Sequence, residues 1–300
     1  PNSSANGSSS PSAKKNKKRK VIGPGLRNLG NTCFLNSTLQ CLCYSPAFAQ
    51  CVISKPVGVN VGTGGNKFGS TNHNVKPARR IPGQISGVVQ SIMENMHKPK
   101  SGGAYSPSVL VKNLKFVNRS FKPYRQEDAH EFLISLLSTM QDAELLQAGI
   151  DAKKSGWRDR LGLKRLDETS LVHRIFGGYF RSQIHCTRCQ YKSNTYDPFL
   201  DLALDISSPN VNSIKSALAR HTGAETLDKD NKYKCSSCHK FVCATKQLTV
   251  FRPPLTLVVQ LKRFKYNPFG GRGGGGKVSK RIKYESTMDL PLSDGRKCKY

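Results

Sequence analysis

Two pairs of cysteines with the spacing Cys-x-x-Cys constrain the fold of this chain more than any other feature. Cys186 and Cys189 form the first pair, and Cys235 and Cys238 form the second pair after 45 intervening residues. Each pair puts two sulfur atoms on one tight turn, and two such turns supply the four thiolates of a tetrahedral zinc site. A redox dithiol would need only one pair. The spacing therefore predicts that two hairpins distant in sequence meet at a metal.

A complete shell of four thiolates leaves zinc no open position, so the expected role of the metal is structural. Two alternatives stay open: the cysteines cap two hairpins without a metal, or His239 replaces one thiolate. The remaining cysteines outside these pairs have no paired spacing and receive no metal-binding role; apart from Cys33 they are Cys41, Cys43, Cys51, Cys243 and Cys298.

Cys33 begins a stretch with helical periodicity. Apolar residues follow it at Leu35, Leu39 and Leu42, and Pro46 ends the pattern. We therefore expect Cys33 in the first turn of an amphipathic helix, where unpaired backbone N–H groups and the positive end of the helix dipole favour the thiolate. The thiolate is the nucleophilic form, so Cys33 is our candidate nucleophile. The alternative is a small, inert core cysteine at a helix start.

Gly30 and Asn28, which precede Cys33 in the sequence, also suit a site with a nucleophilic cysteine. Gly30 allows the backbone to turn sharply into the helix. Asn28 could donate its side-chain amide to an oxyanion, a contribution that is worth about 3 kcal/mol in other acyl-transfer enzymes. The alternative role for Asn28 is turn formation.

These residues belong to a longer pattern. Residues 25–42 read Gly-Leu-Arg-Asn-Leu-Gly-Asn-Thr-Cys-Phe-Leu-Asn-Ser-Thr-Leu-Gln-Cys-Leu and closely resemble the cysteine box of the ubiquitin-specific proteases. Residues 126–133, Gln-Glu-Asp-Ala-His-Glu-Phe-Leu, resemble a second box of that family, and residues 261–264, Leu-Lys-Arg-Phe, resemble a third landmark. The resemblance runs from about Gly23 to the C-terminus.

The resemblance implies an α+β fold with a papain-like helical thumb, a β palm and zinc-ribbon β fingers. It also implies a thiol-dependent deubiquitinase, in which Cys33 attacks the carbonyl of the C-terminal glycine of ubiquitin and forms an acyl-enzyme. Asn28 would help to hold the oxyanion. Gln126 and Asp128 would contact the extended ubiquitin tail, with His130 packed inside, although helix capping is the alternative role of Asp128.

The proton acceptor for Cys33 is missing from the pattern. Family members supply it in a Gly-His-Tyr box and orient it with a later Asp or Asn, but none of the seven histidines here stands in such a box. His173 lies 140 positions after Cys33, as a papain-like base would, yet its sequence setting suggests a packed element. We therefore expect the catalytic His and Asp or Asn outside this chain, which would be a fragment with an incomplete palm and no activity of its own.

The expected organisation starts with a disordered basic leader at residues 1–22. Residues 23–300 would be the catalytic domain. Its expected parts are a thumb at 23–168 with an insertion at 55–82, fingers and the start of the palm at 169–265, a Gly-rich loop at 266–280 and a palm strand region at 281–300. Helical periodicity starts at Ile85 and again near Gln126, and strand alternation starts at Leu255 after two prolines.

The formal net charge of +29 is large for 300 residues, and six of the positive charges lie within residues 14–20. Such a charge attracts polyanions, so RNA or DNA is a possible partner, with a solvated cationic surface as the alternative. The basic leader and residues 175–179 and 196–201 resemble a nuclear or nucleolar branch of the family, and a cytoplasmic location is the alternative. No apolar run is long enough to span a membrane.

Two other classes of function stay open at this point. One is a catalytically dead scaffold that binds ubiquitin. The other is a zinc-containing nucleic-acid-binding protein. The sequence of residues 271–277 is also similar to the motif of a phosphate-binding loop. Val278 stands where that motif needs Ser or Thr, so we do not expect nucleotide binding.

Overall fold

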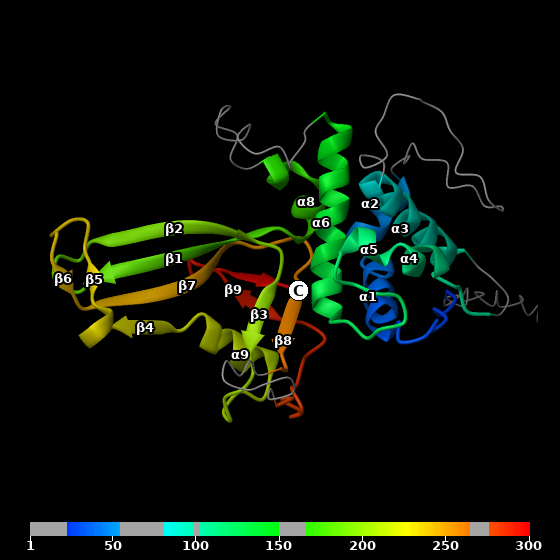
Figure 1. Cartoon of the computed structure of the whole chain (residues 1–300). Helices are drawn as coiled ribbons and strands as arrows, with labels where there is room; N and C mark the ends of the chain where they lie inside the picture. Colours follow the sequence, from blue (N-terminus) through cyan, green and yellow to red (C-terminus); the bar gives the residue numbers. More distant parts are fainter. Residues whose placement is uncertain (1–22, 55–80, 99–102, 150–165, 265–275) are drawn as a thin grey trace, which may run out of the picture.

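The computed structural model describes residues 23–54, 81–98, 103–149, 166–264 and 276–300. Within these ranges a helical lobe and a β lobe lie on either side of one long helix (Figure 1). The expected leader, most of the insertion at 55–82 and most of the Gly-rich loop lie outside the described residues.

The helical lobe is built around α6, with α1 to α5 on the side of α6 away from the β lobe and α8 on the side of the sheet (Figure 1). The α6 helix starts where it does because Asp128 Oδ1 accepts hydrogen bonds from the backbone N–H groups of His130 and Glu131, at 2.8 and 2.9 Å. The described helices of this lobe are α1 (Cys33–Cys43), α2 (Pro46–Ser54), α3 (Ile81–His97), α4 (Ser108–Lys112), α5 (Leu114–Val117), α6 (Ala129–Gln147) and α8 (Leu171–Phe176), preceded by the short 3-10 turn η2 (Leu166–Thr169).

The core of this lobe fixes the start of α1 against the start of α6. The ring of Phe34 meets the edge of the Phe132 ring, with centroids 5.5 Å apart, and both side chains are buried. Leu35 and Leu39 are fully buried, as the periodicity after Cys33 predicts. Each such side chain contributes about 1.5–3 kcal/mol through burial. The residue after Cys33 is thus held firmly in place.

The long strands of the β lobe form a sheet of order β2-β1-β7-β4, and every pairing is antiparallel. Beyond the far end of this sheet lies a small separate hairpin (Figure 1). The strands of the sheet are β1 (Gly178–Cys186), β2 (Lys192–Phe199), β4 (Ala224–Leu227) and β7 (Ala244–Arg252), and those of the hairpin are β5 (Tyr233–Lys234) and β6 (Phe241–Val242).

A second β unit lies between the long sheet and α6. Its strands β3 and β8 pair in parallel, and a separate antiparallel pair, β9 and β10, packs with them around buried residues such as Leu204, Ile206 and Leu290. The elements are β3 (Leu202–Asp205), α9 (Ile214–His221), the 3-10 turn η3 (Lys229–Asn231), β8 (Val259–Lys262), β9 (Asp289–Pro291) and β10 (Lys297–Lys299).

Two expected boundaries were wrong. The helix expected from Ile85 begins at Ile81, within the range assigned to the insertion. The strand expected from Leu255 begins at Val259, and Leu255 is 67% exposed. The physical reason is that the backbone N–H of Thr256 donates to the carbonyl of Ile175 at the end of α8, at 2.8 Å, instead of to a neighbouring strand.

Within the described part of the chain, none of the helices has the length and apolarity needed to cross a bilayer.

Candidate functional site

Cys33 is the first residue of α1, as the sequence predicts, and its side chain is exposed. The preceding residue, Thr32, is buried, and none of the described side chains caps this end of the helix. The N–H groups of the first turn of a helix have no intrahelical partner. Because no capping side chain occupies them here, they can stabilise negative charge that develops near the sulfur.

The turn before Cys33 is held together by the side chain of Asn28. Its Oδ1 accepts hydrogen bonds from the backbone N–H of Gly30 at 3.1 Å, from that of Thr32 at 3.2 Å and from Thr32 Oγ1 at 3.1 Å. Gly30 has φ +93°, a conformation that favours glycine. The amide oxygen is therefore fully engaged inside the turn, and Nδ2 is the group of Asn28 that is left to donate elsewhere.

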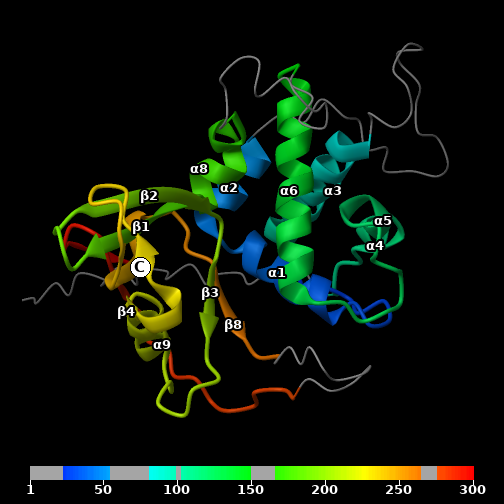
Figure 2. The same cartoon turned by 60° about the vertical axis from the view of Figure 1, so that its left-hand side comes forward.

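A groove of about 860 Å³ runs past Cys33 between the two lobes. The start of α1 and the segment that leads into α6 form one wall, and β8 with the residues after it forms the other (Figures 1 and 2). The lining residues are Cys33, Phe34 and Ser37, then residues 126–130, then residues 260–264. Three predicted site residues, Cys33, Gln126 and Asp128, thus face one groove, while Asn28 does not line it.

Charges of opposite sign stand on the two walls. Glu127 and Asp128 lie on the wall that contains α6, and Lys262 and Arg263 lie on the wall formed by β8. Asp128 also caps α6, so the capping role considered for it is real.

His130 does not pack inside the protein, and that expectation was wrong. Its side chain lines the groove, is 29% exposed and approaches Asp201 with Nε2 and Oδ2 3.0 Å apart. Asp201 stands just before β3, 71 residues further along the chain. No local pattern in the sequence links residues this far apart, so sequence reasoning missed the pair. His173 does not line this groove.

Arg263 holds the segment around Lys280 beside the groove, a role that the sequence alone did not suggest. Its Nη1 donates to the backbone carbonyls of Val278 and Lys280, both at 3.0 Å. The adjacent Phe264 forms an isolated bridge with Lys277 and is 68% exposed at the groove. The described residues on both sides of the Gly-rich loop are therefore fixed to one another.

The four predicted metal-binding cysteines come together at the far end of the long sheet. The sulfur atoms of Cys186, Cys189, Cys235 and Cys238 all lie within 4.8 Å of one another. The Sγ atoms of Cys189 and Cys235 are 3.7 Å apart, close to the edge of about 3.8 Å that a tetrahedron with Zn–S bonds of about 2.3 Å requires. The donor set therefore fits a tetrahedral metal, and this cluster does not include His239.

The two cysteine turns share one geometry. The residue after the second cysteine of each pair, Gln190 or His239, has a positive φ, at +61° and +54°. Its backbone N–H donates to the carbonyl of the first cysteine, Cys186 or Cys235, at 3.0 and 2.9 Å. A backbone hydrogen bond from Tyr191 is the main cause that lowers the pKa of Cys189 to about 7, which favours the thiolate that metal binding needs.

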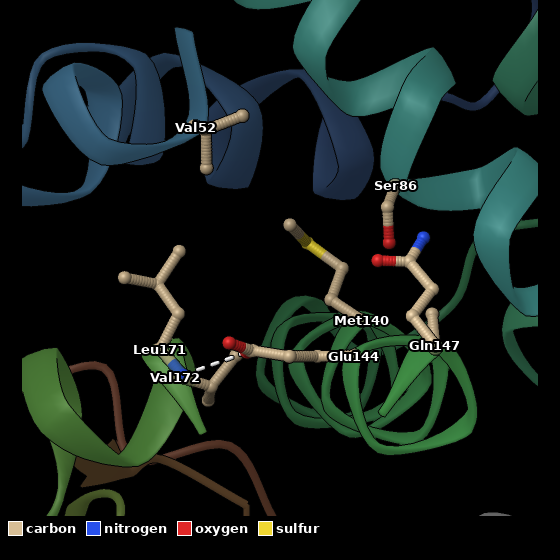
Figure 3. A pocket seen from close by; sticks show the side chains of 8 residues that line it. Val52, Ser86, Met140, Glu144, Gln147, Leu171 and Val172 are labelled. Atoms are coloured by element: carbon tan, nitrogen blue, oxygen red, sulfur yellow. Dashed lines mark hydrogen bonds between the residues drawn. The ribbon is translucent and has the colours of Figure 1, made fainter. Parts of the chain in front are cut away.

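The helical lobe contains another hollow, which does not resemble a reactive site. It has a volume of about 70 Å³ and lies between α2, α3, α6 and α8 (Figure 3). Apolar side chains such as Val52 and Met140 line it, and Glu144 Oε2 accepts a hydrogen bond from the backbone N–H of Leu171 at 2.7 Å. We assign Glu144 the structural role of holding the start of α8.

Comparison with known proteins gives a consistent result. The family model described as "Ubiquitin carboxyl-terminal hydrolase" matches residues 24–298. The chain is 38% identical over 271 residues to ubiquitin carboxyl-terminal hydrolase 23 of Arabidopsis thaliana, covering 90% of this chain and 27% of that protein. It is 36% identical to probable ubiquitin carboxyl-terminal hydrolase 16 of Schizosaccharomyces pombe, covering 89% of this chain and 51% of that protein. The chain thus spans about a quarter and about half of the length of these two relatives.

Solved structures with a similar fold include two of the SAGA DUB module that contains Ubp8, Sgf11, Sus1 and Sgf73. The complex with monoubiquitin matches with a TM-score of 0.68 and 27% identity, covering 91% of this chain and 54% of the matched chain. The complex with ubiquitin aldehyde matches with a TM-score of 0.65 and 26% identity, covering 92% and 54%. The arrangement of helices and sheets described above is therefore shared with these ubiquitin-bound proteins.

Proposed function

Because this chain belongs to the ubiquitin carboxyl-terminal hydrolase family, we propose that it carries the nucleophile and the substrate groove of a thiol-dependent deubiquitinase. The observation that carries this proposal is the position of Cys33. Cys33 is an exposed residue at an uncapped helix start, and it lines a groove of about 860 Å³ between the two lobes. A catalytic thiolate needs such a partly exposed, electropositive setting.

In the proposed reaction, the Cys33 thiolate attacks the carbonyl carbon of the C-terminal glycine of ubiquitin. The carbonyl oxygen becomes an oxyanion, which Asn28 Nδ2 and the N–H groups at the start of α1 stabilise. The C–N bond then breaks, and the lysine amine leaves with the proton that the acceptor took earlier from the Cys33 thiol. Water hydrolyses the thioester, which frees the ubiquitin carboxylate and restores the thiolate.

We propose that the proton acceptor in this reaction is another residue than His130. Although His130 lines the groove and is paired with Asp201, it stands in the second family box and not in a Gly-His-Tyr box. None of the other histidines that the structure describes lines the groove. We therefore propose that the acceptor and the residue that orients it lie outside the described residues, as the absence of a Gly-His-Tyr box in this sequence leads us to expect.

Gln126 and Asp128 are the proposed contacts of the ubiquitin tail. Both line the groove on the wall formed by the start of α6. An extended peptide presents backbone N–H and carbonyl groups, which the Gln126 amide can pair with. The Asp128 carboxylate can pair with arginines of the tail while Oδ1 keeps its capping hydrogen bonds.

We propose that the cysteine cluster binds zinc and that the metal is structural. The separations of the sulfur atoms support this proposal, since they suit tetrahedral coordination by four thiolates. The bound metal would lock the β1–β2 turn to the β5–β6 turn and would take no part in the reaction.

We also propose a nuclear location, which rests on the basic run at residues 14–20. Deletion of this run from a fluorescent fusion of the full-length protein should shift the fusion from the nucleus to the cytoplasm. An unchanged distribution would contradict the proposal.

The test of the enzymatic function is a covalent trap. The full-length protein is incubated with ubiquitin that bears an electrophile at its C-terminus, and the expected result is a one-to-one adduct. Cys33→Ala should abolish the adduct. Cys41→Ala is the matched control, because Cys41 is also exposed on α1 but does not line the groove, and it should retain the adduct. No adduct with the wild type, or an adduct that survives Cys33→Ala, would falsify the assignment.

A further inference from the structure

Tyr124 has an unusual backbone conformation next to the groove. Its φ is +66°, in the left-handed region that bulky side chains rarely adopt, and its side chain is 65% exposed. Such strain persists only where the surrounding structure holds it, and it is concentrated at functional sites. An exposed tyrosine held in this way has no stabilising role in the core.

Tyr124 is interlocked with the turn that leads to Cys33. The side-chain Nδ2 of Asn31 donates to the backbone carbonyl of Tyr124 at 2.9 Å. A Cβ atom at Gly30 would lie 3.2 Å from Cδ1 of the Tyr124 ring, so the ring lies directly against Gly30. Gly30 and Asn31 have positive φ values themselves, at +93° and +53°. Two strained turns thus support each other, and the ring is part of this contact.

The segment that carries Tyr124 is fixed at both ends. Phe121 is buried against Phe34 and Phe132, and Asp128 caps α6. The ring is therefore presented in a defined position before any substrate arrives. A preorganised aromatic side chain is the kind of group that recognises a partner with little loss of conformational entropy.

The position of Tyr124 relative to the groove defines what it can contact. Residues 126–130 line the groove, whereas Tyr124 and the turn at residues 28–32 do not. The Tyr124 ring packs instead on Gly30, and its carbonyl accepts from Asn31, in the turn that leads directly into Cys33. If the ubiquitin tail occupies the groove, Tyr124 offers an exposed ring beside the Cys33 turn and outside that groove.

We propose that Tyr124 contacts the leaving group, which is the protein whose lysine is joined to ubiquitin. This inference rests on the proposed function. The ring can pack on the alkyl stem of that lysine and on the peptide beside it, and its hydroxyl can meet the wet outer surface of the partner. Tyr124 is thereby a specificity-determining residue beside the Cys33 turn and outside the groove proposed for the ubiquitin tail.

The test compares two substrates in the full-length protein. In the first, the C-terminal glycine of ubiquitin carries a small aromatic amine. In the second, it is joined to the lysine side chain of a short peptide. The measured quantity is the ratio of kcat/KM for the peptide substrate to kcat/KM for the small amide.

Three variants of Tyr124 distinguish a loss of contact between the ring and the leaving group from a change in the strained backbone at this position. Tyr124→Phe keeps the ring and should keep the wild-type ratio. Tyr124→Gly removes both the ring and the strain, since glycine accepts this φ, whereas Tyr124→Ala removes the ring and keeps the strain. Both should lower the ratio by about threefold to tenfold, the effect of losing one aromatic contact. Tyr284→Gly is the control, because Tyr284 is 81% exposed and does not line the groove, and it should not change the ratio.

Two results would overturn the inference. Equal losses on both substrates would mean that Tyr124 acts only through the turn that carries Cys33. A wild-type ratio in both the Gly and the Ala variants would mean that the ring touches no leaving group. If the wild type hydrolyses neither substrate, the proposed function itself is contradicted, and this inference falls with it. That result differs from the two above, in which the wild type is active.

Discussion

His130 Nε2 and Asp201 Oδ2 are 3.0 Å apart, and this contact joins the first turn of α6 to the residue before β3. It is a direct polar link between the helical lobe and the β lobe at the groove that contains Cys33. Because the two walls of the groove belong to different lobes, a link of this kind sets their separation.

Asp201→Ala should therefore destabilise the protein and weaken substrate binding. A partly buried hydrogen bond between an imidazole and a carboxylate contributes about 1–2 kcal/mol, so the midpoint of urea unfolding should fall measurably. KM for ubiquitin substrates should rise more than kcat falls. Asp197→Ala is the control, because Asp197 is exposed on β2 and does not line the groove. Equal unfolding midpoints for the two variants would contradict this role of the pair.

Removal of one metal-binding sulfur should release the metal. Cys189→Ser should purify with less than one equivalent of zinc and should unfold at a lower temperature, because metal binding to such a site is coupled to folding. Cys243→Ser provides a matched control, since Cys243 is exposed but does not belong to the cluster. Elemental analysis of both proteins checks the prediction, and a full equivalent of zinc in Cys189→Ser would refute it.

Gly178→Ala should be strongly destabilising. A Cβ atom at this position would lie 2.5 Å from Cζ of Phe199 and 2.8 Å from the carbonyl oxygen of Arg252. The second contact is with backbone, so β1 or β7 must shift, at a cost of about 1–3 kcal/mol. At Gly25 a Cβ would meet nothing within 4 Å, so Gly25→Ala should change thermal stability little. Similar melting temperatures for the two variants would contradict the close contact at Gly178.

His221 should make the protein less stable in mild acid. Burial and the nearby charge of Lys262 lower the pKa of His221. The unfolded chain then binds a proton near pH 6.5, which the folded protein resists, so folding stability is lost as pH falls through that value. His221→Gln should reduce the difference in unfolding midpoint between pH 7.5 and pH 5.5. An unchanged difference would show that other groups control the acid sensitivity.

Local features of the fold could be predicted from the sequence. The apolar spacing after Cys33 predicts α1 and its buried face, because it depends on residues close together in the chain. The two cysteine pairs predict the cluster although they are distant in sequence, because a tetrahedral zinc site needs four such ligands. The strand expected from Leu255 starts later because Thr256 is bonded to Ile175 at the end of α8. The local sequence pattern does not indicate that the N–H of Thr256 bonds to α8 and not to a neighbouring strand.

The contacts that shape the candidate site could not be predicted in this way. Asp201 meets His130 across 71 residues, and Tyr124 meets the turn at Gly30 and Asn31 from a distant segment. Arg263 uses its guanidinium on backbone carbonyls, and every residue offers such a carbonyl. Contacts of this kind depend on how the segments pack, which periodicity and spacing do not encode.

The cysteine cluster lies at the opposite end of the long sheet from the groove (Figure 1). The strand β1 that connects the two ends has nine residues, about 30 Å at about 3.3 Å per residue. The proposed metal would therefore stiffen the end of the sheet that lies far from the groove, whereas the proposed bond cleavage would take place near the other end. If the proposed function and the proposed zinc site are both right, loss of the metal should leave Cys33 reactive toward a short peptide that copies the ubiquitin tail but weaken binding of folded ubiquitin.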